Sequence, residues 1–261
     1  MILTLVISLT ILKPRMLQLN NSKAYKLRDI KKCLKTVFDP ELDESIVDLG
    51  FVSNIEIKSD FHVSIELKLP TYFCSANFAW IMCYDSKKAI EKLSWVLDVE
   101  VELVDHFVMN KVNKGLKNNE TFSSIFGANK ANDITKLRIK FDKKAYLNRQ
   151  SLLIQFLRKK NLLDSEIVNM TLDNLTIFAS KFYDDEFNKN LRRYKTLKEK
   201  LIKNKKNINF AFLDLDGSKI HENNLLEYLR TLRRTTGSIT ANSEMCKILM
   251  KERYSAGGQI K

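Results

Sequence analysis

Cys74 is the side chain of this sequence that is best placed for chemistry. It stands at the end of a loop over residues 70–73 and at the expected start of a helix. The unpaired backbone N–H groups and the helix dipole at such a position favour the thiolate, which attacks electrophiles and ligates soft metals. A free cysteine can also be a small buried hydrophobic residue. Position alone leaves both interpretations open.

A second candidate is the acidic loop over residues 39–50. Pro40 fixes its own φ angle, and Gly50 permits a turn that other residues rarely adopt. The loop carries five carboxylates, namely Asp39, Glu41, Asp43, Glu44 and Asp48. This density exceeds what packing requires. A structural role is nevertheless open to two of them, since Asp39 can cap a turn and Asp48 can bond its own backbone.

The spacing of apolar residues predicts the elements that hold both loops. Helical spacing predicts amphipathic helices over residues 24–37 and 75–93, and Asp39-Pro40 ends the first. Strict alternation predicts a half-buried strand over residues 62–69, and residues 55–57 and 99–103 alternate in the same way. The order α-β-β-α-β predicts a small α+β domain with helices packed against a sheet. A mainly helical C-terminal region follows it.

Taken together, these motifs resemble the metal–sulfur (iron–sulfur) cluster assembly family, SufT/PaaD-like. In chain order they are residues 38–42 (Phe-Asp-Pro-Glu-Leu), residues 45–50 (Ser-Ile-Val-Asp-Leu-Gly), the alternating strand, Cys74 and the closing strand. The resemblance covers residues 24–108 and implies a role in building or delivering iron–sulfur clusters to client enzymes. It also implies that four residues line one binding site, with Cys74 and Asp48 as metal ligands: Asp39, Glu41, Asp48 and Cys74.

The cysteine loop departs from the family pattern at two points. The family has a threonine four residues before the cysteine, where this chain has Pro70, so Thr71 is the substitute binding residue. Ser75 follows Cys74 in place of the family's proline. The aromatic-flanked segment 71–74 resembles longer relatives that accompany binuclear-iron hydrocarbon monooxygenases.

One chain offers few ligands for such a cluster, which normally takes four cysteines, some replaceable by histidine. Cys83 lies nine residues after Cys74, ~13 Å away along a regular helix and on its opposite face. Cys33 falls within the first expected helix. His106 follows the last strand and is a ligand only if the chain folds back to Cys74; otherwise it is simply hydrogen-bonded. We therefore expect a transient cluster, shared between two subunits or held with a partner.

The charge of the chain is divided between its two halves. The whole chain has 44 Lys and Arg against 31 Asp and Glu. Residues 20–108 hold 11 basic and 15 acidic side chains, whereas residues 109–261 hold 31 and 16. This asymmetry suggests two modules with different partners. We expect an assembly-like domain over residues 20–110, a linker over residues 111–133 and a basic helical region over residues 134–261.

The expected N-terminal extension, residues 1–19, begins with an apolar run over residues 2–12. A membrane-spanning helix needs ~20 such residues. Lys13 and Arg15 follow the run, whereas a secretory signal has its basic residues before it. A start of translation at Met16 and a peripheral membrane contact are the two explanations. Four widely spaced cysteines suggest reduced thiols in a cytoplasm, not a disulfide scaffold.

Two features of the C-terminal region have competing interpretations. The basic residues between Arg192 and Lys206 form either a solvated helix face or a docking surface for an acidic protein, and no nucleic-acid-binding motif accompanies them. Residues 210–218 resemble the nucleophile strand of haloacid-dehalogenase-type phosphatases. Only 44 residues follow Gly217 and they have helical spacing, so a strand ending in a turn is predicted instead.

These observations predict a cytoplasmic iron–sulfur cluster assembly or metalloenzyme maturation factor without enzymatic turnover of its own. Its partners would be a client metalloenzyme or other assembly factors, with a homodimer as one arrangement. The alternative is a non-catalytic adaptor that docks an oxygenase or another protein through the basic helical region. Nucleic acid and an integral membrane span are not expected.

Overall fold

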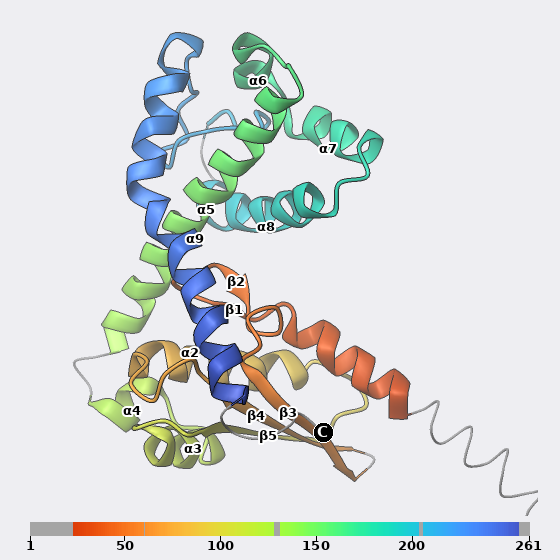
Figure 1. Cartoon of the computed structure of the whole chain (residues 1–261), viewed down its shortest axis with the longest axis vertical. Helices are drawn as coiled ribbons and strands as arrows, with labels where there is room; N and C mark the ends of the chain where they lie inside the picture. The colour runs from red at the N-terminus through yellow and green to blue at the C-terminus, as the bar shows by residue number, and fades with distance from the viewer. Residues whose placement is uncertain (1–22, 60, 128–130, 204–205, 256–261) are drawn as a thin grey trace, which may run out of the picture. The chain divides into compact units, whose positions relative to one another are not determined.

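The computed structural model describes residues 23–59, 61–127, 131–203 and 206–255 (Figure 1). The expected extension over residues 1–19, with Met16, lies outside these residues. The chain divides into two compact units. The sheet unit comprises the residues up to Asp39, Glu44–Ala128 and those from Met245 onward. The helical unit comprises Pro40–Asp43 and Asn129–Glu244.

The sheet unit is built around three strands, β3 (Val52–Ser59), β4 (His62–Lys68) and β5 (Asp98–Val104), drawn as neighbouring arrows in Figure 1. β3 and β4 are antiparallel, and β4 and β5 are parallel. Parallel neighbours require a crossover, which α2 (Ala76–Ile90) provides. The predicted order α-β-β-α-β is therefore confirmed, with residues 23–34 as the first helix.

The register of β4 and β5 gathers the alternating apolar residues on one face. Val63 pairs with Val99, Ile65 with Val101, and Leu67 with Leu103, and all six are buried. Side chains two residues apart along a strand share a face, so the pairs form a continuous apolar surface. Helix α2 packs against β5 and buries residues that include Trp80 and Met82.

The acidic loop contains a short hairpin that the periodicity did not predict. The first helix ends at residue 34, three residues before its expected end, and β1 (Phe38–Asp39) follows. β1 pairs antiparallel with β2 (Glu44–Ser45). The residue before a proline is displaced from helical geometry, which favours the extended conformation of Asp39. Gly50 has φ of 76°, the left-handed conformation that its position in the motif suggested.

Residues 111–133, the expected linker, are largely helical. They contain most of α3 (Met109–Lys117), all of α4 (Phe122–Phe126) and the start of α5 (Ala131–Lys159). In α3, Val112 and Leu116 are buried. Asn113 exchanges two hydrogen bonds with the backbone of Leu103, at 2.8 and 3.0 Å, which fixes α3 beside β5.

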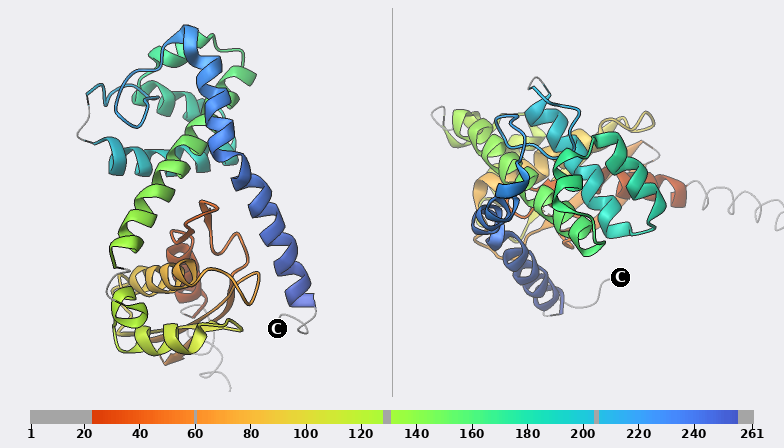
Figure 2. Two further views of the ribbon diagram at one scale, coloured as in Figure 1. Left: turned by 90° about the vertical axis from the view of Figure 1, so that its left-hand side faces the viewer. Right: turned by 90° about the horizontal axis from the view of Figure 1, so that it is seen from above.

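The helical unit contains α5, α6 (Asp164–Asn169), α7 (Leu172–Lys181), α8 (Asp185–Ile202), η2 (Glu222–Asn224) and the larger part of α9 (Leu225–Ser255). α5 and α8 pack against each other where they cross (Figure 2). Their core includes Tyr146 and Tyr194, whose rings stack 5.1 Å apart. The protein is thus α+β with a helical C-terminal region, as predicted. Among the helices of the described residues, none has the length and apolar character needed to cross a membrane.

Candidate functional site

Cys74 lies immediately before the N-cap of α2. The helix begins at Ala76, Ser75 is its N-cap, and the Ser75 side chain makes no capping hydrogen bond. Cys74 is a free, partly exposed thiol. Its Sγ lies 3.3 Å from Oγ1 of Thr71, the threonine expected to replace the family's residue. Thr71 therefore contacts the sulfur directly, through a weak thiol–hydroxyl hydrogen bond.

Two hydrogen bonds to backbone carbonyls fasten the Cys74 loop to the segment that follows β5. The Phe107 N–H donates to the carbonyl of Tyr72 at 3.1 Å. The ring of His106 lies with Nε2 2.9 Å from the Cys74 carbonyl. The Val108 N–H donates to Nδ1 at 3.3 Å, so Nδ1 is the acceptor and Nε2 carries the proton. His106 therefore donates to the Cys74 carbonyl.

His106 is a positioning residue in this arrangement, because both of its ring nitrogens are engaged. Its side chain is buried, at 1% exposure. Burial lowers the pKa of His106, Arg253 adds to that effect, and the hydrogen bond to Cys74 opposes it. The neutral ring is thereby favoured. The chain does fold back to Cys74, which a role of His106 as a metal ligand required. In the structure, however, His106 donates a hydrogen bond to the backbone carbonyl of Cys74.

The last turn of α9 holds the same loop from its other end. Arg253 donates to the carbonyls of Leu69 and Asp105, the latter at 2.7 Å, and pairs with the Asp105 carboxylate at 2.5 Å. Tyr254 donates to the carbonyl of Gly50 at 2.9 Å. Sequence reasoning missed both residues. Leu69 and Arg253 are 184 positions apart, so no local spacing could indicate the contact.

Three exposed aromatic side chains surround the Cys74 loop. Tyr72, Phe73 and Phe107 are 44%, 77% and 48% exposed. Their ring centroids lie 5.0 Å (Tyr72–Phe73), 6.5 Å (Tyr72–Phe107) and 6.2 Å (Phe73–Phe107) apart. Clustered aromatic residues that remain in solvent are typical of interaction surfaces.

The predicted acidic site residues occupy different surroundings. Asp39 is buried in β1, and Asp48 is exposed in the loop that follows β2; both belong to the sheet unit, as Cys74 does. Glu41 belongs to the helical unit. Within the described ranges, no three His, Cys, Asp or Glu side chains form a group that could hold a metal ion. The binding set Asp39, Glu41, Asp48, Thr71 and Cys74 therefore remains a prediction.

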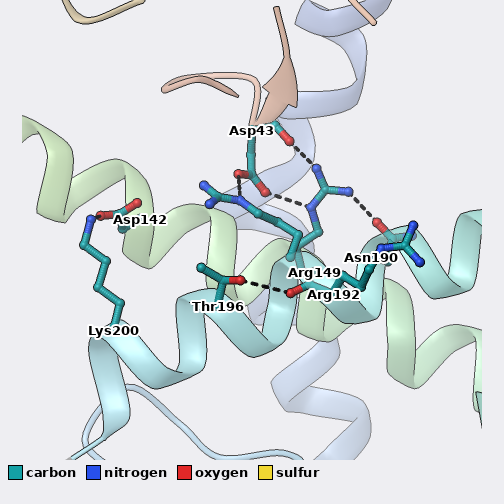
Figure 3. A network of polar contacts seen from close by, with 8 residues as sticks. Asp43, Asp142, Arg149, Asn190, Arg192, Thr196 and Lys200 are labelled. Carbon is teal, nitrogen blue, oxygen red and sulfur yellow. Dashed lines mark hydrogen bonds and ion pairs between the residues drawn. The ribbon is translucent and has the colours of Figure 1, made fainter. Parts of the chain in front are cut away.

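Asp43, at the tip of the acidic loop, is bound by two arginines of the helical unit (Figure 3). Arg149 of α5 and Arg193 of α8 each direct Nε to one oxygen of its carboxylate, at 2.7 Å. Arg149 also donates to the Asp43 carbonyl and to Asn190. Asp43 is only 2% exposed and has φ of 49°. This carboxylate is thus a structural anchor, and it is unsuited to open ligand binding.

The remaining cysteines differ from Cys74 in their surroundings. Cys83 is completely buried in α2, and burial raises its pKa to about 12. Burial and the nearby Asp29 carboxylate raise the pKa of Cys33. Both stay protonated at neutral pH and are poor nucleophiles. Cys246 lies in α9 and is partly buried.

Among the described residues, the basic side chains between Arg192 and Lys206 do not form one solvated face, and Lys205 of the predicted run lies outside the described residues. Arg193 is bound to Asp43, and Lys200 pairs with Asp142 at 2.5 Å. Lys198 is 2% exposed and donates to the carbonyls of Ile208 and Phe210. Several charged side chains of this run therefore form ion pairs or hydrogen bonds within the helical unit.

The phosphatase-like segment contains the predicted turn, but not the strand predicted before it, because Phe210 and Leu213 each form only an isolated bridge. Leu213 and Lys219 form an isolated antiparallel bridge around the turn. Asp214 accepts a hydrogen bond from the Leu215 N–H, and Asp216 from the Ser218 N–H. The two carboxylates thus stabilise the turn.

The similarities to known proteins lie in the first part of the chain. A family model described as iron-sulfur cluster assembly protein matches residues 27–103. An uncharacterised protein of Methanocaldococcus jannaschii is 33% identical over 92 residues, which are 35% of this chain and 95% of that protein. A Porphyromonas gingivalis protein named Fe-S protein maturation auxiliary factor is 29% identical over 93 residues, 36% of this chain and 87% of that protein. No solved structure matches the chain.

Proposed function

This chain belongs to the iron–sulfur cluster assembly protein family, and on that premise we propose that it is a maturation factor that binds or delivers a metal–sulfur unit through Cys74. The observation that carries the proposal is the state of this thiol. Cys74 is partly exposed on a loop that three residues fix from outside, whereas Cys83 is buried and protonated. A carrier needs a ligand that is accessible and held in place.

The metal–sulfur unit is the cargo of this proposal. One partly exposed thiol is too few ligands for a stable cluster, which normally takes four. The cargo would therefore be completed by a second copy of the chain or by a partner protein. Asp39, Glu41 and Asp48 would orient the thiol, ligate iron or hold that partner. A weakly held cluster suits delivery, because a carrier must release it.

The finer features of the proposal follow from the resemblance. We place the protein with the SufT/PaaD-like members, in the cytoplasm, as a factor without turnover of its own. The exposed aromatic residues beside Cys74 suit docking of a client metalloenzyme, for which an oxygenase component is the first candidate.

Anaerobic reconstitution with ferrous iron and sulfide tests the role of Cys74. Wild type, Cys74→Ala and Cys33→Ala would be compared for iron content and visible absorption, before and after addition of a chelator. We expect chelator-labile iron with charge-transfer bands in wild type and in Cys33→Ala, and loss of most of that iron in Cys74→Ala. Cys33→Ala is the matched control because it also removes one thiol from the sheet unit.

Equal and negligible iron in all three proteins would contradict autonomous cluster binding. The remaining function would then be the non-catalytic adaptor, which docks its partner through the helical unit. An adaptor should tolerate Cys74→Ala in a client-activation assay. Reversal of Arg193 does not test docking cleanly, because Arg193 is bound to the buried Asp43.

A further inference from the structure

A groove of about 740 Å³ lies along α5 in the helical unit. Four of its lining residues are lysines of that helix: Lys136, Lys140, Lys143 and Lys144. Glu41 is the one carboxylate that lines it. Lys144 donates to Ser238 at 3.1 Å. For the other three lysines, no ion-pair partner is seen among the residues that the structure describes. The groove therefore carries a net positive charge.

The same groove has an apolar component. Ile139, one residue before Lys140, is 44% exposed, and Leu147 lies two helical turns further along α5. Leu215 contributes from the turn after residue 213. An occupant that covers this surface must present apolar groups between its negative charges.

The spacing of the lysines decides which anionic occupant fits. Lys136 and Lys144 are eight residues apart, ~12 Å along a helix, which is too far for one phosphate group. None of the lining residues is an arginine, and Phe141 is the single aromatic residue among them. Arginine forks and exposed aromatic rings are what nucleic-acid sites use to grip phosphates and stack bases.

We infer that this groove binds an acidic peptide segment of a partner protein, with apolar side chains set between its carboxylates. The inference deepens the proposed function, since it names the chemistry of the partner that the helical unit would dock. The docking surface inferred here lies on α5, whereas the sequence suggested the basic residues between Arg192 and Lys206.

The test measures binding of a fluorescein-labelled peptide of about 12 residues, in which glutamates flank two leucines, to the full-length protein by fluorescence anisotropy. The variant Lys140→Glu/Lys143→Glu reverses two exposed charges of the groove. We expect its affinity to fall about tenfold or more, because attraction becomes repulsion. Ile139→Ser should weaken binding without altering charge.

The matched control is Arg230→Glu/Arg233→Glu, which makes the same change in net charge. Both arginines are exposed on α9, roughly 140–160° around that helix from the groove residue Thr235. This control should bind nearly as wild type does, and a peptide with glutamine in place of glutamate should bind about tenfold more weakly. Circular dichroism would show that each variant is folded.

Three results would overturn the inference: no binding of the acidic peptide, equal weakening by the control variant, or tighter binding of a single-stranded thymidine oligonucleotide. The assay contains no iron, so its failure leaves Cys74-dependent iron uptake standing. Loss of iron uptake likewise leaves the peptide result standing.

Discussion

At the scale of single residues, His106 shows how a buried neutral group can hold the Cys74 loop in place. Its two nitrogens connect the Cys74 carbonyl to the Val108 N–H, and its side chain is removed from solvent. The protonated ring would lose the Nδ1 acceptor and would carry an unfavourable buried charge. The Cys74 loop should therefore depend on pH through a residue that is not itself a ligand.

This gives a pH prediction with a definite sign. Burial lowers the pKa of His106 in the folded state below its ordinary value of 6.5, so the unfolded chain binds a proton more readily. The contribution of neutral His106 to stability is complete above pH 6.5 and is lost as the pH falls toward and through the lower folded pKa. Urea unfolding at pH 7.5 and 5.5 should show a larger loss for wild type than for His106→Gln.

His62→Gln is the control for that experiment, because His62 is partly exposed and pairs with Asp98 at 2.8 Å. Because His106 is intact in this variant, the free energy of unfolding of His62→Gln should fall between pH 7.5 and pH 5.5 as that of wild type does. Identical pH dependence of wild type and His106→Gln would show that His106 does not couple protonation to folding.

At the scale of elements, the tip of the acidic loop is fixed by helices far along the chain. Asp43 is separated from Arg149 by 106 residues and from Arg193 by 150 residues. The sequence indicated a dense set of carboxylates in the acidic loop. It could not indicate which of them would form buried ion pairs. Burial in the folded structure decides which carboxylate is paired, because an ionised carboxylate is stable in the interior only when it has a charged or hydrogen-bonding partner.

Removal of this carboxylate should be strongly destabilising. Asp43→Ala leaves two mostly buried arginines without their shared partner, and we expect a loss of ~3–5 kcal/mol in the free energy of unfolding, measured by urea denaturation. The exposed Glu199→Ala on α8 should change it by less than ~0.5 kcal/mol. A loss for Asp43→Ala as small as that of Glu199→Ala would mean that the ion pairs add little.

At the scale of the whole molecule, the sheet unit is closed by residues from the end of the chain. Arg253 and Tyr254 bond to carbonyls of Leu69, Asp105 and Gly50, on three loops of that unit. The match to the assembly-family model ends at residue 103, so it does not include Arg253 and Tyr254.

Loss of the arginine should loosen the cysteine loop. Arg253→Met removes donors to two carbonyls and the charge paired with Asp105, and we expect it to cost ~1.5–3 kcal/mol of stability. Reaction of Cys74 with a thiol reagent should become several-fold faster. Arg230→Met, on an exposed face of α9, should leave both quantities unchanged. An unchanged thiol reaction rate in Arg253→Met would show that this contact does not restrain the loop.

The sequence alone determined the features that rest on local physics. Period-two alternation predicted β4 and β5, helical spacing predicted α2, and residues 38–50 with Cys74 predicted the family. Tertiary structure decided which side chains remain available. Asp43, Arg193 and Lys198 are consumed by buried contacts, His106 is turned to the Cys74 carbonyl, and α5 presents its lysines in a groove. These outcomes depend on contacts between residues distant in sequence, and solvent exposure is set only when the chain has packed.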